Sequence, residues 1–135
     1  MKVSVNWLKD YVNVGVPTEK LAHKLTMAGL EVERVHAVGD DAVLEIEVTP
    51  NRPDCLNMLG MARETAAIFN KPLKLPRARK IRFPSAKCHI EVLDREACPR
   101  YIGTLIKNVS VVPSPEWLSV RLEAIGLRKI NNVAG

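Results

Sequence analysis

The segment Thr49-Pro50-Asn51-Arg52-Pro53-Asp54 is the stretch best suited to hold a charged side chain in a fixed place. Proline fixes φ at two positions, and the residue before each proline is driven toward extended geometry. Arg52 therefore lies in a rigid link, where its planar guanidinium can make a bidentate contact with a carboxylate or a phosphate. The pattern favours an arginine that locks its own loop or an adjoining subunit, with direct RNA contact as the alternative.

Four glutamates alternate with apolar residues in two short segments: Glu31, Glu33, Glu45 and Glu47. On one face of a strand pair they could bind a cation or a basic partner, but a solvated strand face is the favoured interpretation. Like charges directly opposite each other disfavour strand pairing, so we expect basic side chains nearby, with Arg34 or Arg63 as candidates.

Four basic side chains lie close together within residues 77–82, at Arg77, Arg79, Lys80 and Arg82. They are possible RNA contacts, because phosphate neutralisation needs clustered cations. Residues 1–76 carry a net charge of −1 (9 basic, 10 acidic) and residues 77–135 carry +6 (11 basic, 5 acidic). Phe83 is the lone aromatic residue of residues 72–84, so base stacking is poorly supported and a solvated linker is the favoured interpretation.

No pattern in the sequence indicates a catalytic, cofactor or metal site. The chain has no phosphate-binding glycine loop, nucleophile elbow or HExxH motif, and its three histidines and three cysteines are scattered. Reduced thiols fit a cytoplasmic protein. No apolar run approaches the roughly 20 residues that span a bilayer, so no membrane partner is expected.

The elements that must position these residues form an α+β pattern in residues 1–71. Short helices are expected near residues 5–12 and 18–28, with Thr18 as a cap and Gly29 as the stop. An antiparallel pair over residues 30–33 and 43–48 follows, joined through residues 39–41. Asp54 is expected to cap a helix over residues 55–69, with an apolar stripe at Leu56, Leu59, Ala62, Ala66 and Phe69.

A proline-rich basic linker, residues 72–84, separates this module from a second one, residues 85–135. Strands are expected at residues 88–93 and 101–109. A helix capped by Ser114 should follow, burying Leu118, Leu122 and Ile125 and ending at Gly126. This β-β-α order belongs to an α+β domain whose remaining strands are missing, so we expect the second module to be incomplete and loosely ordered.

Five segments in register resemble the β subunit of bacterial phenylalanine–tRNA ligases, across essentially the whole chain. They are Lys24–Glu33, Leu44–Leu56 with Gly60–Glu64, Cys98–Gly103, Pro113–Leu118 and Gly126–Val133. The resemblance implies an (αβ)2 heterotetramer whose α subunit aminoacylates phenylalanine tRNA with ATP and magnesium. It implies that the first module resembles helix-turn-helix-like domains, and that the second is the start of an editing module.

Two departures from the family limit what this resemblance implies. Many members insert an OB-type tRNA-binding domain where Gly39-Asp40-Asp41 closes a short turn here. Family members also continue past Asn131-Asn132-Val133 into the editing pocket. We therefore expect no catalytic residue, cofactor or metal in these 135 residues.

Two other functions stay open at this point. One is an independent nucleic-acid-binding module, which would bind generic DNA or RNA with a steep salt dependence. The other is a free-standing hydrolase of mischarged tRNA, which would deacylate tyrosyl-tRNA.

Overall fold

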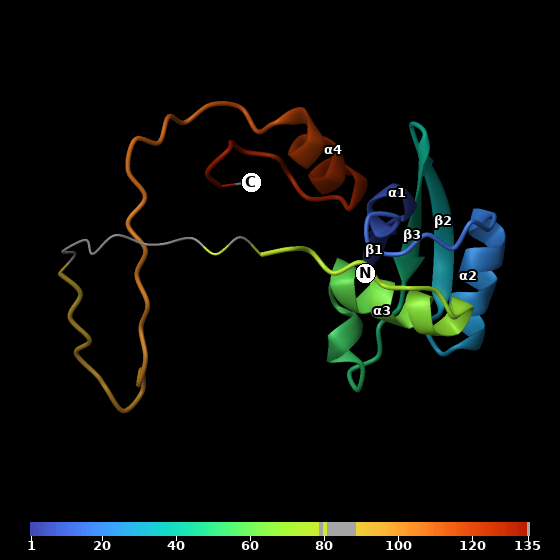
Figure 1. Cartoon of the computed structure of the whole chain (residues 1–135), viewed down its shortest axis with the longest axis horizontal. Coiled ribbons are helices and arrows are strands. Elements are labelled where there is room, and N and C mark those ends of the chain that lie inside the picture. The colour runs from blue at the N-terminus through green and yellow to red at the C-terminus, as the bar shows by residue number, and fades with distance from the viewer. Residues whose placement is uncertain (79, 81–88, 135) are drawn as a thin grey trace. The chain divides into compact units, whose positions relative to one another are not determined.

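The computed structural model describes residues 1–78, 80 and 89–134, in which a three-stranded antiparallel sheet and four helices form a mixed α/β fold (Figure 1). The elements are β1 Lys2–Ser4, α1 Val5–Leu8, α2 Thr18–Met27, β2 Val32–Val38, β3 Asp41–Ile46, the 3-10 turn η1 Pro53–Cys55, α3 Met58–Phe69 and α4 Glu116–Ala124. The α+β class is confirmed at this coarse level.

The sheet has the order β1-β3-β2, so β3 is its central strand. The predicted antiparallel pairing is confirmed, with Val35 opposite Leu44, but the strands cover Val32–Val38 and Asp41–Ile46 where residues 30–33 and 43–48 were expected. Gly39 takes a φ of +60° in the tight turn between them, a conformation that glycine adopts without steric cost. Strand β1 was not predicted. Its three residues are too few to show an alternating pattern, and only its pairing with β3 defines it.

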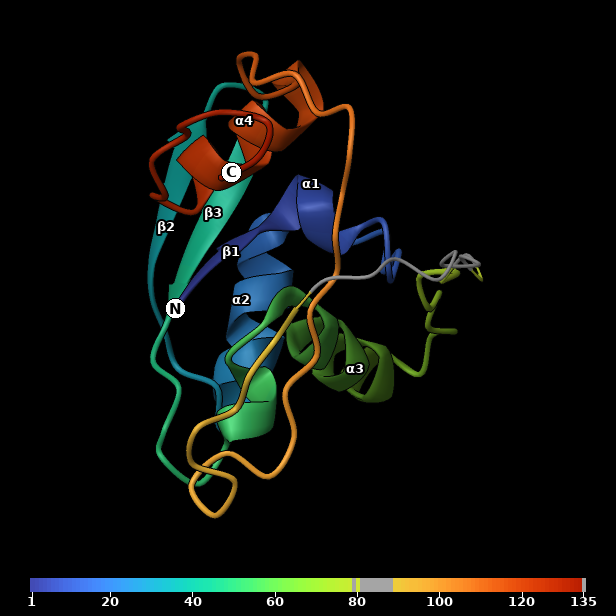
Figure 2. The same ribbon diagram turned by 90° about the vertical axis from the view of Figure 1, so that its left-hand side faces the viewer.

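One face of the sheet packs against α1, α2 and α3, and the core lies between these two layers (Figure 2). Leu21 and Leu25 of α2 and Leu44 and Ile46 of β3 are almost fully buried. Burying such side chains is the main favourable term in folding. The core is largely aliphatic, as a chain with 4% aromatic residues requires, and Met61 of α3 fills its remaining space.

The predicted helix starts need correction. Thr18 is the first helical residue of α2, and Pro17 precedes it without a side-chain cap. Asp54 does not cap the third helix, because it lies in η1 and Asn57 accepts the backbone N–H of Gly60 instead. Because the unpredicted 3-10 turn η1 comes first, α3 begins at Met58 and a different set of its residues faces the core.

That shift also changes which side chains the third helix buries. Leu56, predicted to lie in the buried stripe, is 62% exposed and precedes α3. Ala62 and Ala66 are buried as predicted, and they are joined by Met61 and Thr65. The hydroxyl of Thr65 donates to the carbonyl of Met61, which satisfies it inside the core.

By its contacts the chain divides into two units, residues 1–77 with 112–135, and residues 78–111. The predicted boundary at residues 72–84 stays a prediction, and the structure differs from it in grouping α4 with the first unit. The strands predicted at residues 88–93 and 101–109 are wrong for the described part of the second unit, where residues 89–111 form no strand. Their apolar side chains, Leu93 and Ile106 among them, are largely exposed. An isolated strand pair is only marginally stable without a third strand or a helix to cover it.

Helix α4 contacts β1 and ends as predicted, with Gly126 in the left-handed region at φ +79°. The backbone N–H of Leu127 donates to the carbonyl of Leu122, which closes the last turn. The Ser114 cap is wrong, because Pro115 precedes the helix and no side chain caps it. Ser119 and Ala124 are the residues that α4 buries, whereas the predicted leucine stripe is only half-buried.

Candidate interface site around Arg52

The loop that leaves β3 is a pair of consecutive tight turns. The backbone N–H of Arg52 donates to the carbonyl of Thr49 at 2.9 Å, and that of Cys55 donates to the carbonyl of Arg52 at 3.0 Å. Pro50 occupies the second position of the first turn, where its fixed φ is favourable. Pro53 begins η1, where its missing N–H costs nothing. The sequence therefore gives this loop little conformational freedom.

Arg52 is bound by three side chains that come from its own loop and from α3. Its Nε and Nη2 donate to the two carboxylate oxygens of Asp54 at 3.1 and 2.9 Å, a bidentate contact. Nη2 also lies 2.8 Å from Glu64 Oε1 and 3.1 Å from the Sγ of Cys55. The guanidinium thus ties the loop to the middle of α3.

Glycine at position 60 allows η1 to approach α3 this closely. A β-carbon at Gly60 would lie 1.8 Å from the carbonyl oxygen of Asp54 and 2.8 Å from its carbonyl carbon. Asn57 bridges the two elements, since its amide donates to the Asp54 carbonyl at 3.2 Å while its oxygen caps α3. Backbone packing and side-chain pairing therefore hold Asp54 in the same place.

The charges in this cluster shift the ionisation of its members. The hydrogen bond from Arg52 lowers the pKa of Asp54 to about 2, and the same bond raises the pKa of Arg52. Burial raises the pKa of the Cys55 thiol to about 11, and the neighbouring Asp54 carboxylate adds to this effect. At neutral pH the cluster is a guanidinium between two carboxylates beside a protonated thiol.

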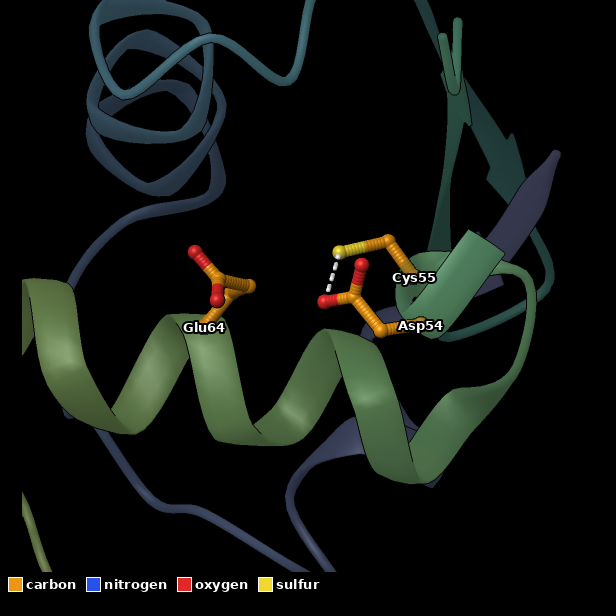
Figure 3. A group of neighbouring side chains, drawn as sticks. All are labelled: Asp54, Cys55 and Glu64. Atoms are coloured by element: carbon orange, nitrogen blue, oxygen red, sulfur yellow. Dashed lines mark hydrogen bonds between the residues drawn. The ribbon is translucent and has the colours of Figure 1, made fainter. Parts of the chain in front are cut away.

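The ligand atoms of Asp54, Cys55 and Glu64 lie within 4.8 Å of one another, which is a spacing that could hold a metal ion (Figure 3). In Figure 3 Glu64 rises from α3 on the side of the helix where the Asp54 and Cys55 side chains also lie. Arg52 Nη2 is already within 3.1 Å of all three groups, so the guanidinium is the cation that balances them. A metal would have to displace Arg52 and ionise a thiol whose pKa is raised. The donor set does not fit a metal centre.

Comparison with known proteins decides the family. Residues 97–134 match the family model described as the B3/4 domain. A phenylalanine–tRNA ligase β subunit from Rhodopirellula baltica is 40% identical over 136 residues, covering 98% of this chain. The chain belongs to the phenylalanine–tRNA ligase β-subunit family. The β subunits from Syntrophus aciditrophicus and Thermosynechococcus vestitus are 47% and 50% identical over 69% and 70% of the chain. The chain spans about a fifth of the Rhodopirellula β subunit and 12% of the other two.

Around the Arg52 cluster, this family member presents exposed side chains. Thr49, Pro50, Asn51 and Pro53 are exposed, and Asp54 keeps 55% of its side chain accessible. Leu56 adds a large apolar side chain next to them. Five of the six predicted residues Thr49 to Asp54 are therefore exposed and Arg52 is half-buried among them; the role of this loop as a subunit interface stays a prediction.

Basic groups lie beside the predicted acidic face at Glu45. A register irregularity between Val32 and Arg34 places Arg34 opposite Glu45 across the strands. Glu45 is also paired with Lys2 at 3.3 Å and with His36 at 3.1 Å, and the His36 hydrogen bond lowers its pKa. The expectation of a basic neighbour is confirmed for Glu45, although Lys2 and His36 make the close contacts.

Of the three remaining glutamates, Glu33 is exposed at the register irregularity, and Glu31 and Glu47 lie beside each other where β2 begins and β3 ends. The backbone N–H of Glu47 donates to the carbonyl of Glu31 at 2.9 Å, and both glutamates line a shallow hollow with Thr26 and Thr49. Of the predicted RNA contacts, Arg77 and Lys80 are exposed, whereas Arg79 and Arg82 lie outside the described residues.

Four members of the Arg52 site were missed from the sequence, namely Cys55, Asn57, Gly60 and Glu64. Glu64 lies twelve positions after Arg52, and no local pattern links them, because the helical phase of α3 brings Glu64 back to the loop. Gly60 had a usable signal, since a glycine inside a helical pattern often marks a close approach. Among the described residues, no helix is long and apolar enough to cross a bilayer.

Proposed function

We propose that this chain supplies an N-terminal scaffold of the β subunit of phenylalanine–tRNA ligase and so serves the attachment of phenylalanine to its tRNA. The 40% identity over 98% of the chain carries this proposal. The proposed partners are the ligase α subunit and phenylalanine tRNA, in an (αβ)2 heterotetramer in the cytoplasm. The whole ligase uses ATP and Mg²⁺, and we assign no residue of this chain to either, nor any catalytic residue.

The Thr49–Asp54 loop is the proposed subunit contact. Its rigidity supports this role, because a surface that is ordered before binding loses little conformational entropy in the complex. Arg52 acts from beneath this surface as a positioning residue. Its Nε and Nη2 are bound within the chain by Asp54 and Glu64, and this arrangement favours a structural role over direct contact with RNA.

The basic residues Arg77, Arg79, Lys80 and Arg82 are the proposed RNA contacts. They follow the last helix of the N-terminal fold and precede the segment that matches the B3/4 domain. Clustered cations of this kind bind phosphates without sequence selectivity. They would add affinity for tRNA, with specificity supplied elsewhere in the ligase.

At a finer level, we propose that residues 1–71 form a helix-turn-helix-like module and that residues 85–135 begin an editing-type module. The B3/4 match over residues 97–134 supports the second assignment. The direct turn at Gly39 and Asp40 supports a form without an inserted OB-type domain. The Rhodopirellula β subunit aligns to 98% of the chain over 136 residues, which leaves no room for a domain-sized insertion within that match.

A chimera tests the function. The matching 136 residues of the Rhodopirellula β subunit would be replaced by this chain, and the product co-expressed with the cognate α subunit. Charging of phenylalanine tRNA at a rate near that of the parent enzyme is the expected result. A chimera that folds and assembles but leaves phenylalanine tRNA uncharged would contradict the scaffold role.

The same chimera tests the Arg52 loop. Arg52→Ala should weaken assembly with the α subunit more than it weakens tRNA affinity, because the loop loses the group that positions it. Arg63→Ala, an adjacent exposed arginine on α3, is the matched control. Normal assembly with a selective loss of tRNA affinity would instead identify Arg52 as an RNA contact.

A further inference from the structure

Strand β2 is an open edge of the sheet, because the strand order is β1-β3-β2 and no strand among the described residues pairs with its outer side (Figure 2). Its residues from 33 to 38 are all exposed, and Val35 and Val38 keep 47% and 44% of their surface accessible. The other edge strand, β1, has three residues against seven in β2. An open edge of this length offers unpaired backbone groups to a further strand.

The pairing with β3 shows which backbone groups of β2 face outward. In an antiparallel pair, residues that bond to the neighbouring strand alternate with residues whose backbone points away. The N–H of Glu47 donates to the carbonyl of Glu31 at 2.9 Å, so by alternation positions 41, 43 and 45 of β3 also bond to β2. Their partners are positions 38, 36 and 34 of β2. The N–H and C=O groups of Val35 and Ala37 therefore point away from the sheet.

The features that normally protect an edge strand stop short of these residues. A register irregularity interrupts the edge between Val32 and Arg34, and the hydroxyl of Thr26 accepts the N–H of Val32 at 3.0 Å. Residues 35–38, Val-His-Ala-Val, include no lysine, proline or further irregularity. This part of the edge is therefore unprotected against pairing with another strand.

The unprotected stretch is complementary to a second copy of itself. It runs from Arg34, after the irregularity, to Val38, before the turn. In an antiparallel pair of copies these two ends lie opposite each other, and Val35 lies opposite Ala37. Asp40 of one copy then lies two positions beyond Val38, within reach of the Arg34 side chain of the other copy. Neither Arg34 nor Asp40 has an ion-pair partner among the residues that the structure describes. Opposite charges would thus meet at both ends of the pairing.

We propose that β2 pairs antiparallel with β2 of a second copy of this chain, joining two three-stranded sheets across a two-fold axis at His36. Val35 and Ala37 of the two copies exchange backbone hydrogen bonds. Val35 lies in the same row as the buried Leu44, so the pairing also covers apolar surface on the core side of the sheet. The symmetry closes the assembly at a dimer. This pairing does not depend on the proposed role in the ligase.

Sedimentation velocity of the 135-residue chain tests the pairing. We expect a monomer–dimer equilibrium over about 0.01–1 mM, because interfaces well below about 1,000 Å² are transient. Amide exchange measured by NMR across this range should slow at Val35 and Ala37 as the dimer forms. The amides of Arg34, His36 and Val38 already bond to β3 and should change less. A chain that stays monomeric, forms larger species, or dimerises without added protection at Val35 and Ala37 would overturn the proposal.

Variants separate strand pairing from other contacts between copies. Ala37→Pro removes an N–H that the monomer does not use, so the fold should persist and dimerisation should weaken at least about tenfold. Arg34→Glu should weaken the dimer about two- to tenfold, and adding Asp40→Lys should restore it by reversing both charges of the pair. Lys24→Glu makes the same charge change at an exposed position of α2 and should have no effect. A dimer insensitive to Ala37→Pro, or a double variant no tighter than Arg34→Glu, would overturn the pairing.

Oxidative cross-linking tests the register. In a chain carrying Cys88→Ser and Cys98→Ser, His36→Cys would place two thiols opposite each other across the axis. They form a non-hydrogen-bonded pair, whose Cα atoms lie about 4.5 Å apart, and this separation allows a disulfide. Mild oxidation should therefore give a covalent dimer linked at position 36. His23→Cys, at an exposed position of α2, is the control and should stay monomeric. Equal cross-linking of the two variants would overturn the register.

Discussion

Gly60 lies so close to Asp54 that a β-carbon on Gly60 would sit 1.8 Å from the Asp54 carbonyl oxygen. The contact joins α3 to the turn that carries the Arg52 cluster, and the atoms opposing Gly60 belong to the backbone. The neighbour therefore cannot rotate away. The geometry of the candidate site depends on this contact as much as on its charged side chains.

Gly60→Ala should destabilise the chain by about 1–3 kcal/mol, the usual range for overpacking a filled interior. Helix propensity alone predicts the opposite sign, since alanine is the better helix former by about 1 kcal/mol. Denaturant unfolding measures the change. The reverse exchange, Ala67→Gly, is the matched control at an exposed position of α3 and should cost about 1 kcal/mol. A Gly60→Ala protein more stable than the parent would contradict the contact.

Acid should release Asp54 only at very low pH. Its folded-state pKa of about 2 lies below its ordinary value of 3.8. Its contribution to folding is therefore complete above about pH 4 and is lost as the pH falls through about 2. Carboxyl NMR titration measures the pKa directly. Arg52→Lys, which cannot form the bidentate pair, should return the Asp54 pKa toward 3.8. If Asp54 titrated near pH 4 in the parent chain, its carboxylate would not be paired with Arg52, and the proposed cluster would be contradicted.

The Cys55 thiol should resist alkylation in the folded chain. Burial keeps it protonated, with a pKa of about 11 against an ordinary 9.0. The stabilisation from the protonated thiol is present below pH 9 and is lost as the pH rises through about 11. Site-resolved mass spectrometry after iodoacetamide treatment at pH 8 should find Cys98 modified well before Cys55. In denaturant the alkylation rates of Cys55 and Cys98 should converge. Rapid alkylation of Cys55 in native buffer would show that its thiol is accessible and would contradict the prediction.

Arg121 should hold α4 on the N-terminal fold. Arg121 pairs with Asp10 and lies against both tryptophan rings. Ser119 and Ala124 are the buried residues of α4. Arg121→Ala should lower the protection of α4 amides from hydrogen exchange, with a loss of about 1 kcal/mol for an exposed ion pair and its ring contacts. Lys129→Ala removes another ion pair at the end of α4 and should have little effect. Unchanged exchange in the Arg121 variant would assign α4 docking to its apolar contacts alone.

Replacing Arg77, Arg79, Lys80 and Arg82 by alanine should weaken tRNA binding uniformly across tRNA sequences. If all four neutralise phosphates, the slope of log affinity against log salt should become about 3 to 4 units shallower. Filter binding between 50 and 200 mM salt measures it. The control replaces Lys9, Lys20, Lys24 and Lys71, which lie in the first module. If the slopes of log affinity against log salt were equal for the two variants, the linker residues would contribute no more to tRNA binding than the lysines of the first module.

Local patterns in the sequence were enough to predict much of the first module. Apolar periodicity predicted α2, the β2–β3 pair and the body of α3, since each pattern spans enough residues to define a face. Gly39 and Gly126 were placed correctly in turns because left-handed backbone geometry favours glycine. The rigidity of the Thr49–Asp54 loop followed from two prolines whose effects are local.

Other features depended on partners distant in sequence. Strand β1 exists only because Leu44 lies beside Val3, and Arg52 is neutralised partly by Glu64 of the next helix. The strands expected at residues 88–93 and 101–109 are absent from the described residues 89–111 for a similar reason, since a strand needs a partner strand and no local alternation supplies one. The sequence by itself determined the turns, the helix-forming segments and the family. Tertiary structure alone decided which charges meet, because ion pairs and sheet edges depend on distances in space that no local spacing encodes.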